Sequence, residues 1–248
     1  MRHMARMGRS TVQKRLSAPR VYSVPRKPRH GRFVVRTGPG PHPRALSIDP
    51  VTLLRDYLGL VKSAREALFV LSNRYLLVDG VARTDSSFPI GLMDVVEIKR
   101  EERAFRMVPA KGRLLYPAPI QESEKGLKIS RIVSKVTVRG GRIQLGTHDG
   151  RSILVDDPGS YRVGDSLLIR VPGQEIVSRI PLEKGSTALV IGGSRRSALG
   201  RIVDVIPGSF SVRPAVELEL EGERVLVPRE LVMPVGLPDP PITVRWVE

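Results

Sequence analysis

Cysteine is absent from the sequence, aromatic residues are few, and no long hydrophobic run occurs. Without cysteine the protein can form no disulfide, thiolate metal site or cysteine nucleophile, and this composition fits a reducing cytoplasm. Aromatic residues make up 4% of the chain, and 23 glycines and 21 prolines interrupt it often, so several small cores are expected. No apolar run approaches the roughly 20 residues that span a bilayer, and no signal-peptide pattern begins the chain. We expect a cytoplasmic protein with no membrane partner.

Patterns typical of catalysis and of cofactor binding are also missing. His148 and Asp149 are adjacent in an expected turn, where neighbours seldom face each other, and no nucleophile is in view. Gly192-Gly193 lacks the Gly-Lys-Ser/Thr that would complete a phosphate-binding loop, and metal-ligand spacing is absent. We therefore expect no enzyme activity, no cofactor, no bound metal and no small-molecule substrate.

Positive charge is what the sequence has in excess, and its distribution is uneven. The chain has 41 Lys and Arg against 25 Asp and Glu, a net charge of +16, which is typical of a polyanion-binding protein. Twelve of these cations lie in residues 1–44, and the first acidic residue is Asp49. The body of the chain is therefore nearly balanced, and most of the excess belongs to an N-terminal arm.

Residues 1–48 are predicted to form an extended basic arm, because its six prolines fix φ and restrain the residues before them. A short strand is possible at Phe33–Val35. An arm of this kind suits RNA, since each phosphate contact adds to a salt-dependent affinity. Its candidate RNA-binding residues are Arg6, Arg9, Lys14, Arg15, Arg20, Arg26, Lys27, Arg29, Arg32 and Arg36.

Residues 49–98 carry signals for two helices and a small sheet. Asp49-Pro50 is typical of a helix start, and Ser63 with Glu66 forms a capping box that predicts a second helix over 64–72. Asp79-Gly80 predicts a hairpin between strands, and a third strand is expected at 95–98. Basic residues flank these elements, so we interpret the segment as a compact RNA-binding domain with candidate contacts at Arg55, Lys62, Arg65, Arg74 and Arg83.

The remaining chain is expected to be β-rich. Residues 99–128 are interpreted as a connector, residues 129–182 as a small barrel or sandwich, and residues 183–248 as a second β unit that ends in a strand containing Trp246. The loop Gly192–Arg196 combines free backbone N–H groups with two guanidinium groups, which suits a phosphate backbone. The loop adds Arg195 and Arg196 to the candidate contacts, and Arg201 in the following segment is a further candidate.

Several of these motifs resemble one family, the small-subunit ribosomal "S-four-e" proteins of archaea and eukaryotes, and its archaeal branch in particular. The resemblance covers nearly the whole chain. The motifs that carry it include Lys14-Arg15-Leu16, Thr37-Gly38-Pro39, Lys62-Ser63-Ala64-Arg65-Glu66, Val78-Asp79-Gly80, Phe88-Pro89, Gly91-Leu92-Met93-Asp94-Val95, His148-Asp149-Gly150-Arg151, Leu199-Gly200-Arg201-Ile202 and Pro207-Gly208-Ser209-Phe210.

The resemblance implies an α+β, mostly β fold with four parts. These are the arm at 1–48, an S-four-type RNA-binding domain at 49–98, a connector and central β domain at 99–182, and an SH3-like KOW barrel at 183–248. It implies a structural role on small-subunit ribosomal RNA beside neighbouring ribosomal proteins. Two alternatives stay open, an RNA-modifying enzyme and a transcription-associated factor that carries the same modules.

Overall fold

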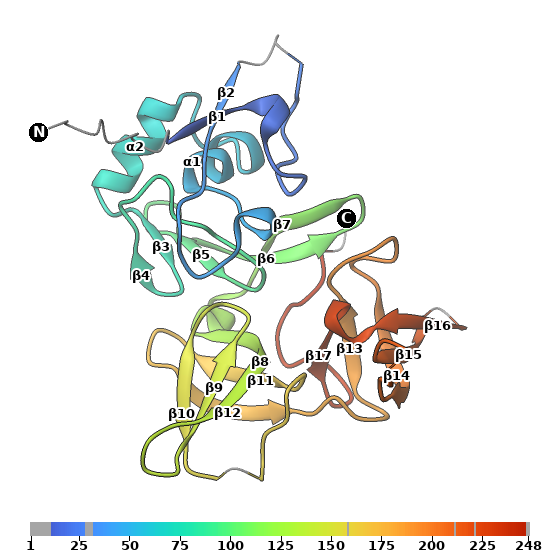
Figure 1. The fold of residues 1–248 in the computed structure, drawn as a ribbon. Helices are drawn as coiled ribbons and strands as arrows, with labels where there is room; N and C mark the ends of the chain where they lie inside the picture. The colour runs from blue at the N-terminus through green and yellow to red at the C-terminus, as the bar shows by residue number, and fades with distance from the viewer. Residues whose placement is uncertain (1–10, 28–31, 158, 211, 221, 247–248) are drawn as a thin grey trace, which may run out of the picture.

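The computed structural model describes residues 11–27, 32–157, 159–210, 212–220 and 222–246. An N-terminal hairpin and short helices lie at one end of the molecule next to a first sheet, and a central and a C-terminal sheet lie beside each other at the other end (Figure 1). The protein is mostly β with few helices, as predicted. None of the described helices has the length and apolar character needed to cross a membrane.

The arm is predicted to be extended, and its described part forms a hairpin that folds back onto the helices. The strand β1 (Val12–Lys14) pairs antiparallel with β2 (Phe33–Val35), and a 3-10 turn, η1 (Arg15–Ser17), follows β1. Between the strands, Val21 and Tyr22 are 0% and 2% exposed. The few apolar residues of the arm thus join a core that other segments supply, and this burial offsets the cost of ordering the arm.

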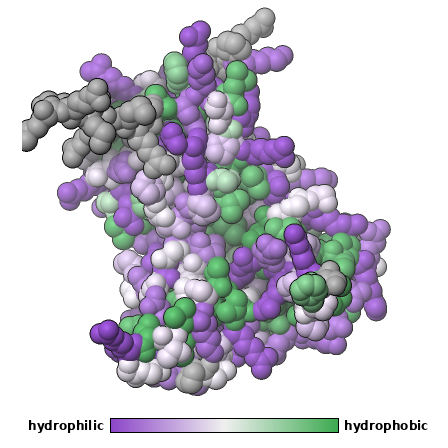
Figure 2. Space-filling model, viewed as in Figure 1, coloured by the Kyte–Doolittle hydropathy of each residue, from purple (hydrophilic) through white to green (hydrophobic). Residues whose placement is uncertain are grey.

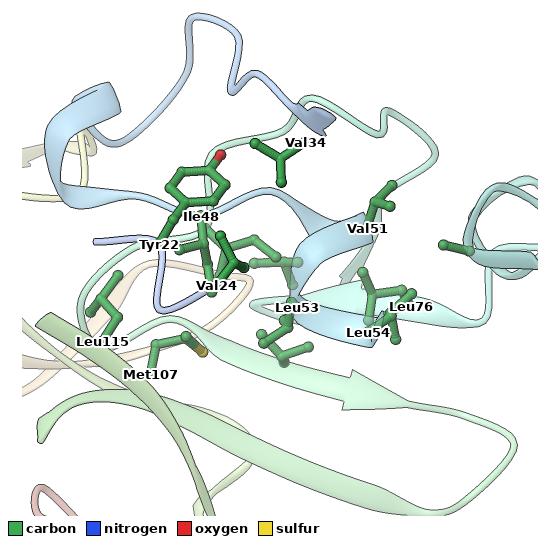
Figure 3. Close-up of a cluster of buried hydrophobic side chains, with 14 of the residues drawn as sticks. Tyr22, Val24, Val34, Ile48, Val51, Leu53, Leu54, Leu76, Met107 and Leu115 are labelled. Carbon is green, nitrogen blue, oxygen red and sulfur yellow. The ribbon is translucent and has the colours of Figure 1, made fainter. Parts of the chain in front are cut away.

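That core connects the arm to the helices and to the first sheet. Figure 3 shows Tyr22 and Val24 of the arm within the same apolar cluster as Leu53 of the helical segment and Met107 and Leu115 of the sheet. All five side chains are buried. Because the described part of the arm contributes to this core, that part belongs to the folded body.

The first helical segment begins where the sequence predicts. The Asp49 Oδ2 atom accepts a hydrogen bond from the Thr52 N–H at 2.8 Å, which caps α1 (Pro50–Thr52). The segment continues as a π-helical turn, η4 (Leu53–Tyr57), and Gly59 ends it with a φ of +66°. A short 3-10 turn, η3 (Arg44–Leu46), precedes it.

The second helix, α2 (Ala64–Ser72), matches the predicted bounds. The Ser63 Oγ accepts from the Glu66 N–H at 3.2 Å, and the Glu66 carboxylate accepts from the Lys62 N–H at 2.8 Å. The first bond satisfies a backbone donor in the first turn of the helix, and the second satisfies the donor just before the N-cap. The capping box therefore fixes where α2 starts.

The first sheet has the strand order β4-β3-β5-β6-β7 and extends past residue 98, so much of the predicted connector at 99–128 is sheet. Proline is uncommon inside strands, so the prolines of this segment argued against strands in the sequence. Pro109 lies at a register shift between Val108 and Ala110, and Pro117 lies in β7, an edge strand, where proline is tolerated. The strands are β3 (Leu76–Val78), β4 (Val81–Ala82), β5 (Val95–Ile98), β6 (Arg103–Ala110) and β7 (Arg113–Pro119).

The hairpin between β3 and β4 turns at Asp79 and Gly80, as predicted. Their φ angles are +51° and +76°, the pair of positive values that a two-residue hairpin requires. The turn brings Asp79 to the border with the central sheet, where Pro172 lies close to Gly80.

The central sheet has the order β10-β9-β8-β11-β12, and the C-terminal sheet has the order β16-β15-β14-β13-β17. Their strands are β8 (Leu127–Thr137), β9 (Ile143–Thr147), β10 (Ser152–Val155), β11 (Ser166–Arg170), β12 (Glu175–Ile180), β13 (Thr187–Val190), β14 (Leu199–Ile206), β15 (Ala215–Leu220), β16 (Glu223–Pro228) and β17 (Val232–Gly236). Two 3-10 turns, η5 (Glu122–Glu124) and η6 (Arg229–Leu231), precede β8 and β17.

The prediction of a terminal strand containing Trp246 is wrong. After β17 the described chain is irregular, and it returns to the first sheet. There the ring of Trp246 contacts that of Tyr116 in β7, with 4.9 Å between ring centroids. The C-terminal segment thus spans two sheets.

Candidate nucleic-acid interface

Two arginines of the arm use their charge inside the protein. Arg15 is 5% exposed, its Nη1 donates to the Pro25 carbonyl at 3.2 Å, and its Nη2 lies 3.8 Å from Asp56 Oδ1. Arg26 donates to five backbone carbonyls between residues 15 and 22, and the shortest bond reaches Ala18 at 2.7 Å. These two side chains hold the arm in its folded shape.

Other cations of the arm are free to contact a partner. The side chains of Lys14, Arg20, Lys27 and Arg32 are exposed, and Arg36 is half-buried. Within the described residues none of these five forms an ion pair. Arg6, Arg9 and Arg29, which the sequence also predicts as contacts, lie outside the described residues.

The ends of α2 carry a second group of free cations. Lys62 and Arg65 lie at its N-terminal end, Arg74 follows its C-terminal end, and all three are exposed. None of the three side chains forms an ion pair in the part of the chain that the structure describes. Arg55 differs, because its Nη2 lies 2.6 Å from Asp56 Oδ2, and this pair neutralises part of its charge.

The remaining predicted contacts lie on the first and C-terminal sheets. The Arg83 guanidinium lies 4.4 Å from the centre of the Phe88 ring, a cation–π contact. Arg195 pairs with Glu223 at 3.3 Å, Arg196 is half-buried, and Arg201 is exposed on β14. The structure therefore spreads the candidate contacts over several regions of the surface. On the face in Figure 2, hydrophilic residues are widespread and hydrophobic ones form small patches.

A buried cluster of charges, which the sequence analysis did not predict, joins three parts of the chain. The Lys128 Nζ at the start of β8 lies 2.7 Å from Asp79, 2.5 Å from Asp94 and 2.9 Å from Asp149. The His42 Nε2 of the arm lies 3.0 Å from Asp94 Oδ1. We call these residues, together with Arg151, the Lys128 cluster. No local pattern in the sequence singles out Lys128, because Arg131 and Lys135 lie in the same strand.

Burial and mutual attraction act in opposite directions within this cluster. Burial disfavours the charged ammonium, but attraction to Asp94, Asp79 and Asp149 outweighs it and raises the pKa of Lys128. Burial likewise opposes ionisation of Asp94 and Asp149, yet the neighbouring positive charges hold the pKa of both carboxyl groups below the ordinary range. The charges are therefore fixed and paired.

His148 lies beside this cluster, but its role is structural. Its Nδ1 accepts a hydrogen bond from the Arg131 N–H at 3.1 Å, and its Nε2 lies 3.2 Å from the Leu92 carbonyl oxygen, which places the ring proton on Nε2. Burial lowers the pKa of His148 to about 4. Asp149 bonds to Lys128, Thr147 and Arg151 instead of the ring. No group of His, Asp and Glu among the described residues could hold a metal ion.

Comparison with known proteins places the chain in a family. The model of "Ribosomal family S4e" matches residues 101–176, and that of the "RS4NT (NUC023) domain" matches residues 7–45. The small ribosomal subunit protein eS4 of Aeropyrum pernix is 40% identical over 248 residues, which cover 97% of each chain. That of Archaeoglobus fulgidus is 37% identical and covers 92% of this chain and 94% of the relative.

A solved structure agrees with these sequence relatives. The crystal structure of the 30S ribosomal protein S4e from Thermoplasma acidophilum matches with a TM-score of 0.68 and 32% identity, over 77% of this chain and 95% of that chain. The likeness extends over nearly the full length of the sequence relatives and includes both the arm and the central sheet. The chain therefore belongs to the ribosomal S4e family.

Proposed function

We propose that this protein is a structural constituent of the small ribosomal subunit and binds small-subunit ribosomal RNA. The observation that carries the proposal is the division of its cations. Arg15, Arg26 and Lys128 have carbonyl or carboxylate partners inside the fold, whereas the cations of the arm surface and of α2 form no ion pair among the described residues. Cations of the second kind can neutralise phosphates and release counterions.

The candidate contacts have distinct roles in this proposal. The free arm cations Lys14, Arg20, Lys27, Arg32 and Arg36 supply most of the salt-dependent affinity. Arg55, Lys62, Arg65, Arg74 and Arg83 set the position of the first sheet and α2 on the RNA. Arg195, Arg196 and Arg201 add contacts from the C-terminal sheet.

We also propose a role for each folded part. Residues 49–98 act as an S-four-type RNA-binding domain, supported by the two capped segments and the Asp79-Gly80 hairpin. The central sheet is a family-specific domain, and residues 183–248 form an SH3-like KOW barrel. The support for the barrel is one sheet of five antiparallel strands in which the last strand, β17, pairs with the first, β13. In the cytoplasmic ribosome, neighbouring small-subunit proteins would be further partners.

The alternative of an RNA-modifying enzyme has no support among the relatives, which are ribosomal proteins. The decisive experiment is ultraviolet crosslinking of the full chain in purified small subunits, followed by sequencing of the bound RNA. We expect the protein in a one-to-one ratio with the subunit and crosslinks to small-subunit ribosomal RNA. Substoichiometric amounts, or crosslinks to messenger RNA or polymerase instead, would overturn the proposal.

A further inference from the structure

A basic cleft separates the tip of the first sheet from the C-terminal sheet. One cavity of about 320 Å³ is lined by Lys111, Arg113, Tyr116, Arg245 and Trp246, among others. A second, of about 440 Å³, also includes Lys111 and Arg245 in its lining and adds the loop that follows β13. Because they share these residues, the two cavities form one cleft, of a size typical of ligand sites.

Five cations face this cleft, and sequence reasoning included only two of them. Among the described lining residues, one carboxylate, that of Glu223, opposes them, and it pairs with Arg195. The cleft is therefore strongly positive. Its cations are Lys111, Arg113, Arg195, Arg196 and Arg245.

An aromatic pair lies at one end of the cleft. The ring centroids of Tyr116 and Trp246 are 4.9 Å apart at an interplanar angle of 55°, and the Arg113 guanidinium lies 5.1 Å from the centre of the Tyr116 ring. Trp246 is only partly buried against an apolar cluster that includes Val108, and it also lines the cavity. Aromatic rings beside guanidinium groups form a surface on which nucleic-acid bases stack.

We propose that this cleft binds a single-stranded segment of RNA, with one unstacked base against Trp246 and the flanking phosphates on Lys111, Arg195 and Arg245. The proposal rests on the function proposed above and assigns a subsite within it. An A-form duplex does not fit this chemistry, because its bases are stacked and its grooves hide them from an aromatic side chain. Phosphate alone would account for the cations but not for the adjoining rings.

Trp246 makes the test direct, since it is the only tryptophan of the chain. The full-length protein would be titrated with an adenosine octamer RNA, with an octamer of abasic ribose phosphates, and with a short RNA duplex. Tryptophan emission would be recorded together with the anisotropy of a labelled RNA. We expect saturable quenching by the adenosine octamer, and binding without quenching by the other two.

Matched variants separate stacking from folding. Trp246→Ala should weaken octamer binding about 5- to 150-fold, the range for one base stacked on an aromatic ring, and Trp246→Phe should retain most of the affinity. A double variant, Lys111→Gln with Arg245→Gln, changes two exposed side chains and keeps the tryptophan. It should need a higher concentration of the adenosine octamer to quench the tryptophan emission, and this test remains available if Trp246→Ala fails to fold. Lys184→Gln, an exposed lysine paired with Asp204, is the control and should change nothing.

Three results would overturn the inference: unchanged emission while the adenosine octamer binds, equal quenching by the abasic octamer, or quenching by a glutamate octamer but not by RNA. The last result would assign the cleft to an acidic peptide. If emission stays unchanged but the protein still binds small-subunit ribosomal RNA in filter assays, the subsite fails and the proposed function stands. Loss of all RNA binding would instead count against the function itself.

Discussion

The Lys128 Nζ lies 2.7 Å from Asp79 Oδ2, although the two residues are 49 positions apart in the chain. This buried pair joins the central sheet to the hairpin turn of the first sheet, and His42 attaches the arm to the same cluster through Asp94. The cluster thus fixes three parts of the protein relative to one another. A rigid arrangement suits a partner whose phosphates have fixed positions, such as folded RNA.

The first prediction concerns Lys128. Lys128→Met would leave Asp79, Asp94 and Asp149 close together with less positive charge among them, so we expect a loss of about 3–5 kcal/mol in the free energy of unfolding. Urea denaturation measures this loss. Lys125→Met is the matched control, because Lys125 pairs with Glu122 at the surface and surface ion pairs contribute little to the free energy of unfolding. Equal stability of the two variants would contradict the role of the cluster.

The second prediction concerns acid sensitivity. Burial lowers the pKa of His148 to about 4, whereas the unfolded chain takes up a proton near pH 6.5. The unfolded state therefore binds more protons as the pH falls from 6.5 to 4, and stability decreases by up to about 3 kcal/mol over that range. Imidazole resonances in NMR should show His148 neutral down to about pH 4. Titration of His148 near pH 6.5 in the folded protein would show that its burial does not cause the loss of stability in acid.

The third prediction concerns Asp49, whose pKa burial raises to about 6. Because the folded pKa exceeds the unfolded value near 4, the folded state binds more protons between these values, and stability falls as the pH rises from 4 to 6. Asp49→Asn keeps an oxygen to cap Thr52 and removes the buried charge. Thermal unfolding should show the variant more stable at pH 7.5, by as much as about 3 kcal/mol, and similar at pH 4. The same difference at both pH values would argue against a charge effect.

The fourth prediction separates two arginines of the arm. Arg20→Gln should leave the unfolding temperature unchanged and reduce the salt slope of RNA binding by about 1, since Arg20 is exposed. Arg26→Gln should destabilise the fold by on the order of 2 kcal/mol, because a charged donor to backbone carbonyls is lost. Circular dichroism melting and filter binding at several salt concentrations test both variants. Equal destabilisation by the two changes would show that Arg20 and Arg26 do not have the separate binding and structural roles assigned to them.

The sequence predicts those features that depend on neighbouring residues. Ser63 and Glu66 interact across three positions, so their pattern alone locates the start of α2. Asp79 and Gly80 form a complete turn signal. The strands β6 and β7 escaped prediction because Pro109 and Pro117 are tolerated only through a bulge and an edge position, which are properties of the whole sheet.

The candidate RNA contacts and the Lys128 cluster could likewise be predicted only in part. Basic residues are visible in the sequence, but Arg20 and Arg26 differ only in the tertiary contacts that surround them. The Lys128 cluster combines residues from the arm and from two sheets, and no local sequence pattern predicts it. Trp246 meets Tyr116 across 130 positions of the chain. Such groupings exist only once the sheets have packed.

We expect the free cations of the arm to dominate the salt-dependent affinity for RNA. Deleting the arm would also remove Val21 and Tyr22 from the core, so substitution is the cleaner change. A fivefold variant would carry glutamine at Lys14, Arg20, Lys27, Arg32 and Arg36. Its control would carry glutamine at five exposed arginines in the strands and loops of the central and C-terminal parts, namely Arg139, Arg142, Arg170, Arg213 and Arg224. Of these, Arg170 pairs with Glu175 at the surface, where such pairs contribute little to stability.

The measurement is the slope of log affinity against log salt for small-subunit ribosomal RNA, with melting curves to confirm that both variants are folded. We expect the arm variant to lose about 3.5–4.5 in slope, at roughly 0.7–0.9 for each phosphate contact, and the control to lose much less. An arm variant that folds and keeps the slope of the unchanged protein, or a control that loses as much, would show that the arm does not dominate RNA binding.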